Sequence, residues 1–98
     1  MNANDLYASL DEGGSGRINN DDGSVRITVM TEGPKWVSLT VKGDDPDARN
    51  IVQLAFELAE TNYSEQTNND ATEVMLQTSY AYDTGFFHVT AAVVDWMT

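Results

Sequence analysis

Hydrophobic and polar residues alternate along four stretches of the chain, which is the period-2 pattern of half-buried β-strands. These stretches cover 24–31, 37–42, 72–82 and 86–96. A Gly-Pro turn at 33–34 separates the first two, and Asp83-Thr84-Gly85 separates the last two. Each pair therefore predicts a β-hairpin. Between the N-terminal residues and the first hairpin, Ile18 marks a further short edge strand.

The hydrophobic spacing changes to the helical period in two other stretches. Leu6 and Leu10 lie one turn apart and predict a short helix over 3–12. Asp45-Pro46-Asp47 predicts the start of a longer helix over 46–62, with Asp45 as the N-cap. We expect the polar, Asn-rich segment 63–71 to be a loop and Gly14-Ser15-Gly16 to be a linker.

Together these elements predict a single α+β domain over residues 1–98. The expected architecture is an antiparallel sheet of four or five strands, with the main helix packed on one face and a short N-terminal helix beside it. Met30 and Trp36 fall on the outer face of the first hairpin, where the pattern is otherwise polar. We expect Met30 to pack beneath the N-terminal helix.

Charge is the most unusual property of the sequence. Sixteen acidic residues oppose five basic ones, for a net charge of −11, and no Lys or Arg follows Arg49. Such a field repels nucleic acids and anionic membranes and attracts basic protein surfaces. We therefore expect a basic protein partner and no direct binding of nucleic acid or membrane. Acidity that serves only solubility, or adaptation to salt, is the competing explanation.

The residue types needed for catalysis or metal binding are scarce. The chain has no cysteine, and His88 is its only histidine, expected on the outer face of its strand. The acidic turn at 19–23 lacks the ligand spacing of a calcium loop. We expect no catalytic, cofactor-binding or metal-ligating residues, and therefore no enzyme. The N-terminus does not resemble a signal peptide, so a cytoplasmic location is expected.

Several carboxylates are candidates for contact with a basic partner. Glu57 and Glu60 lie one turn apart on the main helix, and three further acids are expected to continue the line of charge. Near the helix start, three more acids surround the predicted N-cap, and a nearby tryptophan could anchor an interface. The partner-binding candidates are Asp44, Asp45, Asp47, Glu57, Glu60, Glu65, Asp70, Glu73 and Trp36.

The opening Met1-Asn2-x-Asn4-Asp5-Leu6, followed by the hairpin 24–41 and the helix 51–58, resembles small acidic type II-A anti-CRISPR proteins. The resemblance covers the first two-thirds of the chain; the hairpin 73–96 departs from that pattern. It implies a phage-encoded inhibitor that occupies the DNA-recognising groove of a CRISPR effector nuclease and presents carboxylates where phosphates would lie.

The leading hypothesis is therefore an acidic, non-enzymatic inhibitor that mimics DNA and blocks a nuclease or another DNA-handling protein. An immunity or antitoxin-type protein that binds one toxin through Trp36 or Trp96 is a second hypothesis. A viral structural or assembly protein, with sheet edges pairing between copies, is a third. The expected state is a monomer or a small homo-oligomer.

Overall fold

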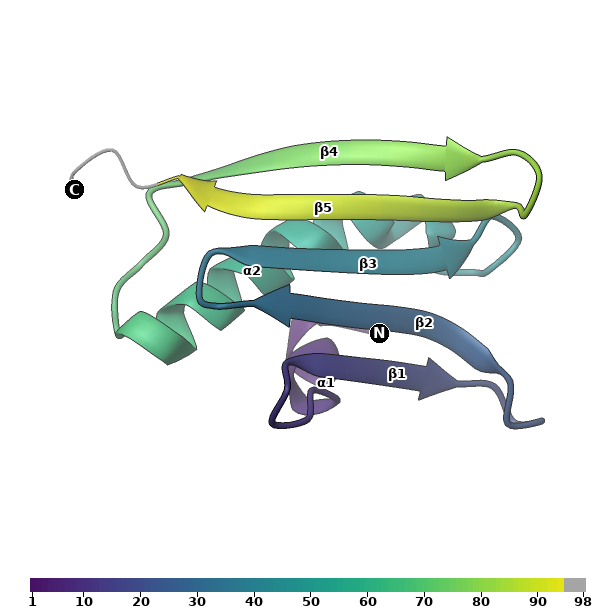
Figure 1. The fold of residues 1–98 in the computed structure, drawn as a ribbon, viewed down its shortest axis with the longest axis horizontal. Helices are drawn as coiled ribbons and strands as arrows, with labels where there is room; N and C mark the ends of the chain where they lie inside the picture. The colour runs from purple at the N-terminus through teal and green to yellow at the C-terminus, as the bar shows by residue number, and fades with distance from the viewer. Residues whose placement is uncertain (95–98) are drawn as a thin grey trace.

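The computed structural model describes residues 1–94 and contains one antiparallel five-stranded sheet with two helices on the same side (Figure 1). The strands lie in the order β1-β2-β3-β5-β4. Their bounds are β1 (Ser15–Asn19), β2 (Val25–Glu32), β3 (Trp36–Lys42), β4 (Glu73–Ala81) and β5 (Phe86–Val94). The helices are α1 (Ala3–Ala8), the 3-10 turn η1 (Ala48–Asn50) and α2 (Ile51–Thr67). This arrangement confirms the predicted α+β class.

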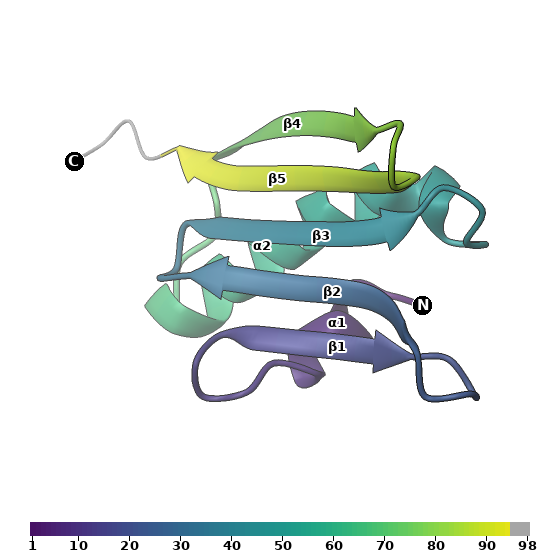
Figure 2. The same cartoon turned by 45° about the vertical axis from the view of Figure 1, so that its right-hand side comes forward.

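The hydrophobic core fills the space between the sheet and the helices. The central strands turn every second residue toward this layer, as the alternating pattern predicts. The strand residues buried there are Ile27, Val29, Val37, Leu39, Val41, Val89, Ala91 and Val93. From the helices, the largest buried contributions are Leu6, Ile51, Leu54, Leu58 and Tyr63. Figure 2 shows that α1 lies behind β1 and β2, whereas α2 lies behind β3 and β5.

No described element covers the opposite face of the sheet. Met30 lies on this face and is 47% exposed, because strand alternation turns it away from buried Val29. The prediction that Met30 packs beneath the N-terminal helix is therefore wrong. Its placement on the outer face of the hairpin, together with Trp36, is confirmed.

Helix α1 is shorter than predicted. Its start is fixed by a capping box, in which the Asn2 side chain accepts from the Asp5 amide and the Asp5 carboxylate accepts from the Asn2 amide. The Ser9 hydroxyl donates to the Leu6 carbonyl at 2.6 Å, so the helix ends there. The Asp11 carboxylate instead accepts amides of the following turn, which makes the predicted extension to residue 12 wrong.

Helix α2 is shifted toward the C-terminus relative to its predicted range of 46–62. The Asp45 carboxylate accepts the Asp47 amide at 2.8 Å and forms a tight turn there, so α2 begins only at Ile51. At the other end, buried Tyr63 keeps the chain on the core, and the helix continues to Thr67 before Asn68 adopts a left-handed conformation. The predicted loop is therefore helical up to Thr67.

The Gly14-Ser15-Gly16 segment is not a linker. Ser15 begins β1, and Gly16 is buried opposite Val29 of β2. This strand is the short edge strand expected around Ile18. The predicted hairpin turns are also present, with left-handed Gly33 between β2 and β3 and left-handed Gly85 between β4 and β5. The predicted end of the last strand, including Trp96, lies outside the described residues.

In the turn between β1 and β2, hydrogen bonds to the Asp22 carboxylate make the stability of the fold depend on pH in acid. The Asp22 carboxylate accepts from the Ser24 hydroxyl at 2.6 Å and from the Ser24 amide at 2.9 Å. These bonds lower the pKa of Asp22 below its ordinary value of 3.8. A lowered folded-state pKa means that the stabilisation is present above pH 3.8 and is lost as the pH falls through the folded value.

We therefore expect the Asp22→Asn variant to be less stable than the wild type at pH 7, with the difference shrinking in strong acid. Urea unfolding at several pH values measures this difference, and an NMR titration of the Asp22 carboxyl should give a midpoint below 3.8. A stability difference that is constant down to pH 2 would contradict the assignment.

Candidate functional site: the acidic surface of α2

Helix α2 carries carboxylates on the side that faces away from the sheet. Leu54 and Leu58 are buried against the strands, while Glu60 is exposed on the outer side of the helix. Glu57 is half-buried one turn earlier, and its carboxylate accepts from the Gln53 amide at 3.0 Å. Because the opposite side of the helix packs into the core, these two carboxylates are held on a rigid support.

Three acids from the end of α2 and the following loop gather around one hollow of about 400 Å³. Glu60, Glu65 and Asp70 line it, together with Asn4 of α1. We define the acidic surface of α2 as Glu57, Glu60, Glu65 and Asp70. None of these four residues forms an ion pair in the described structure, and the sequence from Asn50 onward contains no Lys or Arg to supply one.

Two of the predicted partner-binding acids are already engaged within the protein. The Arg26 guanidinium donates to both carboxylate oxygens of Asp45, at 2.7 and 3.0 Å, and also to Asp47. Only 22% of the Arg26 side chain and 7% of the Asp45 side chain are exposed. The hydrogen bond to Asp45 raises the pKa of Arg26 above its ordinary value, so the group stays cationic. This cluster ties β2 to the segment before α2.

The remaining predicted residues do not line the hollow beside α2. Asp44 is exposed beside Lys42 at the end of β3. Glu73 begins β4 and alternates with half-buried Val74. Trp36 is half-buried and pairs in register with Ala92, on the uncovered face of the sheet. The structure therefore gathers Glu57, Glu60, Glu65 and Asp70 and separates them from the tryptophan.

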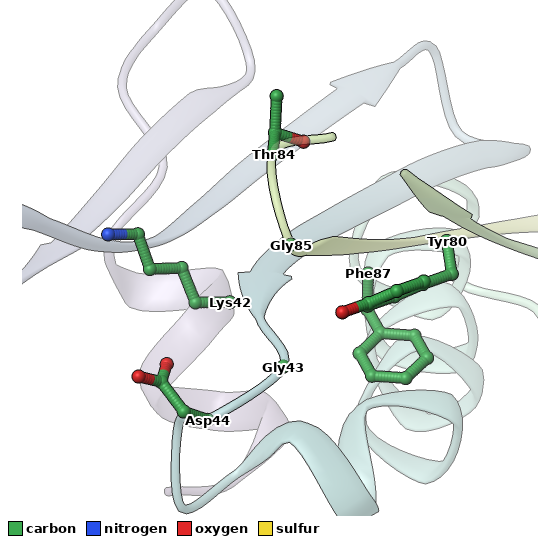
Figure 3. Close-up of a pocket in the computed structure, with 7 residues that line it drawn as sticks. All are labelled: Lys42, Gly43, Asp44, Tyr80, Thr84, Gly85 and Phe87. Atoms are coloured by element: carbon green, nitrogen blue, oxygen red, sulfur yellow. The ribbon is translucent and has the colours of Figure 1, made fainter. Parts of the chain in front are cut away.

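A hollow of about 440 Å³ lies where the segment after β3 meets the β4–β5 turn (Figure 3). Lys42 and Asp44 extend on one side of it, and the tilted Tyr80 and Phe87 rings contact each other on the other side, with centroids 4.7 Å apart. Thr84 and two glycines complete the lining. The Lys42 ammonium and the Asp44 carboxylate thus lie on the side of the hollow away from the Tyr80 ring.

Comparison with protein-family models, curated proteins and solved structures finds no match to this chain. Its function is therefore argued from geometry. His88 lies on the uncovered sheet face as expected, with Nδ1 2.9 Å from the Thr40 hydroxyl. Within residues 1–94, no three His, Asp or Glu side chains are placed to share a metal ion. None of the helices within residues 1–94 combines the length and the apolar composition that a membrane-spanning segment needs.

Sequence analysis missed the Arg26 cluster. Arg26 and Asp45 are far apart along the chain, and the predicted N-cap role gave Asp45 a different partner. One signal was present: β2 and β3 form a hairpin whose open end brings the start of β2 close to the residues that follow β3. An arginine at the start of β2 and aspartates after β3 are therefore candidates for an ion pair.

Proposed function

We propose that the protein is a non-enzymatic inhibitor that binds a basic, nucleic-acid-binding surface on a nuclease or other DNA-handling protein. The acidic surface of α2 is the contact region, and its carboxylates take the positions of phosphates. The resemblance to small acidic anti-CRISPR proteins makes a CRISPR effector one such target, and an inhibitor of this kind acts in the host cytoplasm. The observation that carries the proposal is the group of carboxylates around α2 with no cation paired to them.

Electrostatics favours this surface over the other acidic parts of the protein. Asp45 and Asp47 are compensated by Arg26, so they add little attraction for an outside cation. Glu60, Glu65 and Asp70 have no such compensation and converge on one hollow. Neighbouring like charges strengthen the local negative potential, which speeds encounter with a basic surface and orients it.

The rigid support also favours binding. Residues three or four apart on a helix have Cβ atoms about 5–6 Å from each other, which fixes the spacing of Glu57 and Glu60. A flexible acidic tail would lose conformational freedom on docking, and that loss would offset its Coulomb gain. Side chains on a packed helix lose less conformational freedom when they dock. The surface is thus better suited to displace a nucleic acid than its charge count alone suggests.

The uncovered sheet face supports a second candidate function, an immunity-type protein that binds one toxin. Trp36 lies on this face, and Met30 and Met75 are exposed there. Tryptophan at the centre of an apolar patch is a frequent hot spot in protein interfaces. Under this alternative, Trp36→Ala weakens binding more than any loss of charge on α2 does.

The test is inhibition of DNA binding by a purified type II-A CRISPR effector complex and by a panel of basic nucleases. We expect wild-type protein to compete with DNA and to lose potency as salt rises, since salt screens charge. The variant E57Q/E60Q/E65Q/D70N should be weaker by about 100-fold, given about 1.5–3 kcal/mol for a hydrogen bond to a charged group and partial compensation among four.

A matched variant separates the position of the charges from their number. E12Q/D21N/E32Q/D83N removes four acids that are exposed and lie in other parts of the fold. It should retain most of the inhibition. Equal losses in the two variants would mean that only total charge matters, and absence of inhibition across the panel would refute the proposal. A large effect of Trp36→Ala alone would favour the immunity-type alternative.

A further inference from the structure

Strand β4 forms an edge of the sheet, and no described element lies along its outer side (Figure 1). The register identifies which of its backbone groups point outward. The Val93 amide donates to the Lys35 carbonyl at 2.8 Å, so odd-numbered residues of β5 bond to β3. Even-numbered residues of β5 then bond to their odd-numbered partners in β4. The outward-facing residues of β4 are Val74, Leu76, Thr78 and Tyr80.

The two edges of the sheet differ in how they resist pairing with another chain. Edge strand β1 has five residues, carries Arg17 at its centre, and has a register shift between Ile18 and Asn19. Short length, a central charge and an irregularity are features that protect edges. Strand β4 has nine residues in unbroken register and contains no Gly, Pro, Lys or Arg. It is therefore the unprotected edge.

The charge distribution also distinguishes the edge formed by β4 from the edge formed by β1. The chain has a net charge of −11, yet Asp83 is the only Asp, Glu, Lys or Arg between Val74 and Val94. Apolar side chains are exposed along the strand instead: Met75 is 60% exposed and Leu76 is 40% exposed. From Val74 to Ala81 the edge carries no charged side chain, so this part of it offers no attraction to a cationic partner. It does allow a second copy to approach, since the mutually repelling carboxylates lie elsewhere.

We propose that β4 pairs antiparallel with β4 of a second copy, about a two-fold axis that passes beside Gln77. In this register, Val74 lies opposite Tyr80 of the second copy, and Leu76 lies opposite its Thr78. All four outward residues then exchange backbone hydrogen bonds, and the two sheets become one continuous sheet. Residues on each face stay on that face across the junction, so Leu76 and Tyr80 meet apolar or neutral neighbours.

Neighbouring registers are less favourable. Centring the pair on Thr78 brings Glu73 close to Asp83 of the second copy, which places like charges together. Centring it on Leu76 moves Tyr80 past the end of the partner strand, which starts at Glu73, so the outward groups of Tyr80 have no partner. In the Gln77 register, Glu73 lies opposite Ala81 of the second copy and two residues away from its Asp83, and Tyr80 lies opposite Val74.

The proposed dimer does not depend on the proposed inhibitory function, because the dimer uses the edge of β4 and inhibition uses the acidic surface of α2. A two-fold axis perpendicular to the sheet leaves both α2 helices on the same side of the assembly. If the inhibitor proposal also holds, the dimer presents two acidic surfaces toward one side.

A single cysteine tests the register, because the chain has none of its own. Gln77 would face its own copy across the axis in a non-hydrogen-bonded pair, with Cα atoms about 4.5 Å apart, within the range of about 4.4–6.8 Å for a disulfide. Gln77→Cys should therefore form a covalent dimer under mild oxidation, detected by mass spectrometry and non-reducing electrophoresis.

The control variants are Met75→Cys and Ser79→Cys. Two copies of either residue would be four positions apart along the paired strands, or about 14 Å at about 3.4 Å per residue, too far to be bridged. Each alone should therefore remain uncrosslinked, whereas an equimolar mixture of the two should form a mixed dimer. Crosslinking of Gln77→Cys no faster than that of either control alone would overturn the proposed register.

Sedimentation equilibrium of the wild-type chain tests the dimer without cysteine. Thr78→Pro should raise its dissociation constant at least about tenfold, because proline removes an outward N–H and a donor to the second copy. Bonds between β4 and β5 are unaffected, since Thr78 points outward, so circular dichroism should be unchanged. A wild-type chain that sediments as a monomer up to about 1 mM would refute the dimer. A Kd of that size corresponds to a binding free energy of only about −4.1 kcal/mol.

Discussion

Replacing Leu58 with alanine is expected to lower the free energy of unfolding by about 2–5 kcal/mol. Leu58 is fully buried on the side of α2 that faces the sheet, within the cluster formed by the central strands. Truncation removes apolar contacts and leaves a cavity, because packed strands on one side and a helix on the other cannot close fully around it. The loss is a large fraction of the total stability expected for a domain of this size.

Urea denaturation followed by circular dichroism measures this effect. Val52→Ala is the matched control, because Val52 belongs to the same helix but is 40% exposed. Its expected change is within about 0.5 kcal/mol, as for most surface substitutions. If both variants lose similar stability, then α2 is not packed as described, and the rigid support assumed for its carboxylates is lost as well.

Replacing Gly16 with alanine is expected to cost about 1–3 kcal/mol, although the change adds one methyl group. A Cβ at Gly16 would lie 2.6 Å from the Ser9 carbonyl oxygen and 2.9 Å from its carbonyl carbon. These are backbone atoms at the end of α1, so no side-chain rotation relieves the overlap. Either α1 shifts away from β1, or the strand loses its register with β2.

Denaturation and hydrogen exchange of the α1 amides measure this effect together, because a displaced helix exchanges faster. Gly13→Ala is the control, since a Cβ there meets only the flexible Asp11 carboxylate, at 3.3 Å. It should change stability by less than about 1 kcal/mol. Adding Ser9→Ala to the Gly16 variant should not restore stability, because the backbone carbonyl remains in place. Full rescue by Ser9→Ala would mean that the hydroxyl, rather than the backbone, is the obstacle.

The candidate site was only partly predictable. Glu57 and Glu60 follow from helical periodicity, since i, i+3 spacing places both on one side. Glu65 was expected in a loop, and its position beside Asp70 depends on the extension of α2 to Thr67. The compensation of Asp45 and Asp47 by Arg26 required knowing that the start of β2 lies beside the residues after β3. Local sequence patterns do not specify such distant pairs.

The errors in the fold have the same origin. Ser15 and Gly16 of the predicted linker belong to strand β1, where the absence of a Cβ at Gly16 allows the end of α1 to approach the sheet closely. The local sequence of this segment, rich in glycine, predicted a linker instead. Similarly, Asp45 has the composition of an N-cap, yet its carboxylate is held by the Asp47 amide and by Arg26. In both places, contacts between distant segments overrode a local preference.

By itself, the sequence determined the class of the fold, the two hairpins, the side of each central strand that is buried, and the excess of negative charge. These properties depend on the alternation of residues and on composition, which are local. The tertiary structure decided where α2 begins and ends, which carboxylates are paired, and that β4 rather than β1 is the unprotected edge. Those properties depend on strand order and on side chains meeting across the sheet, where the energy comes from contacts between residues far apart in the chain.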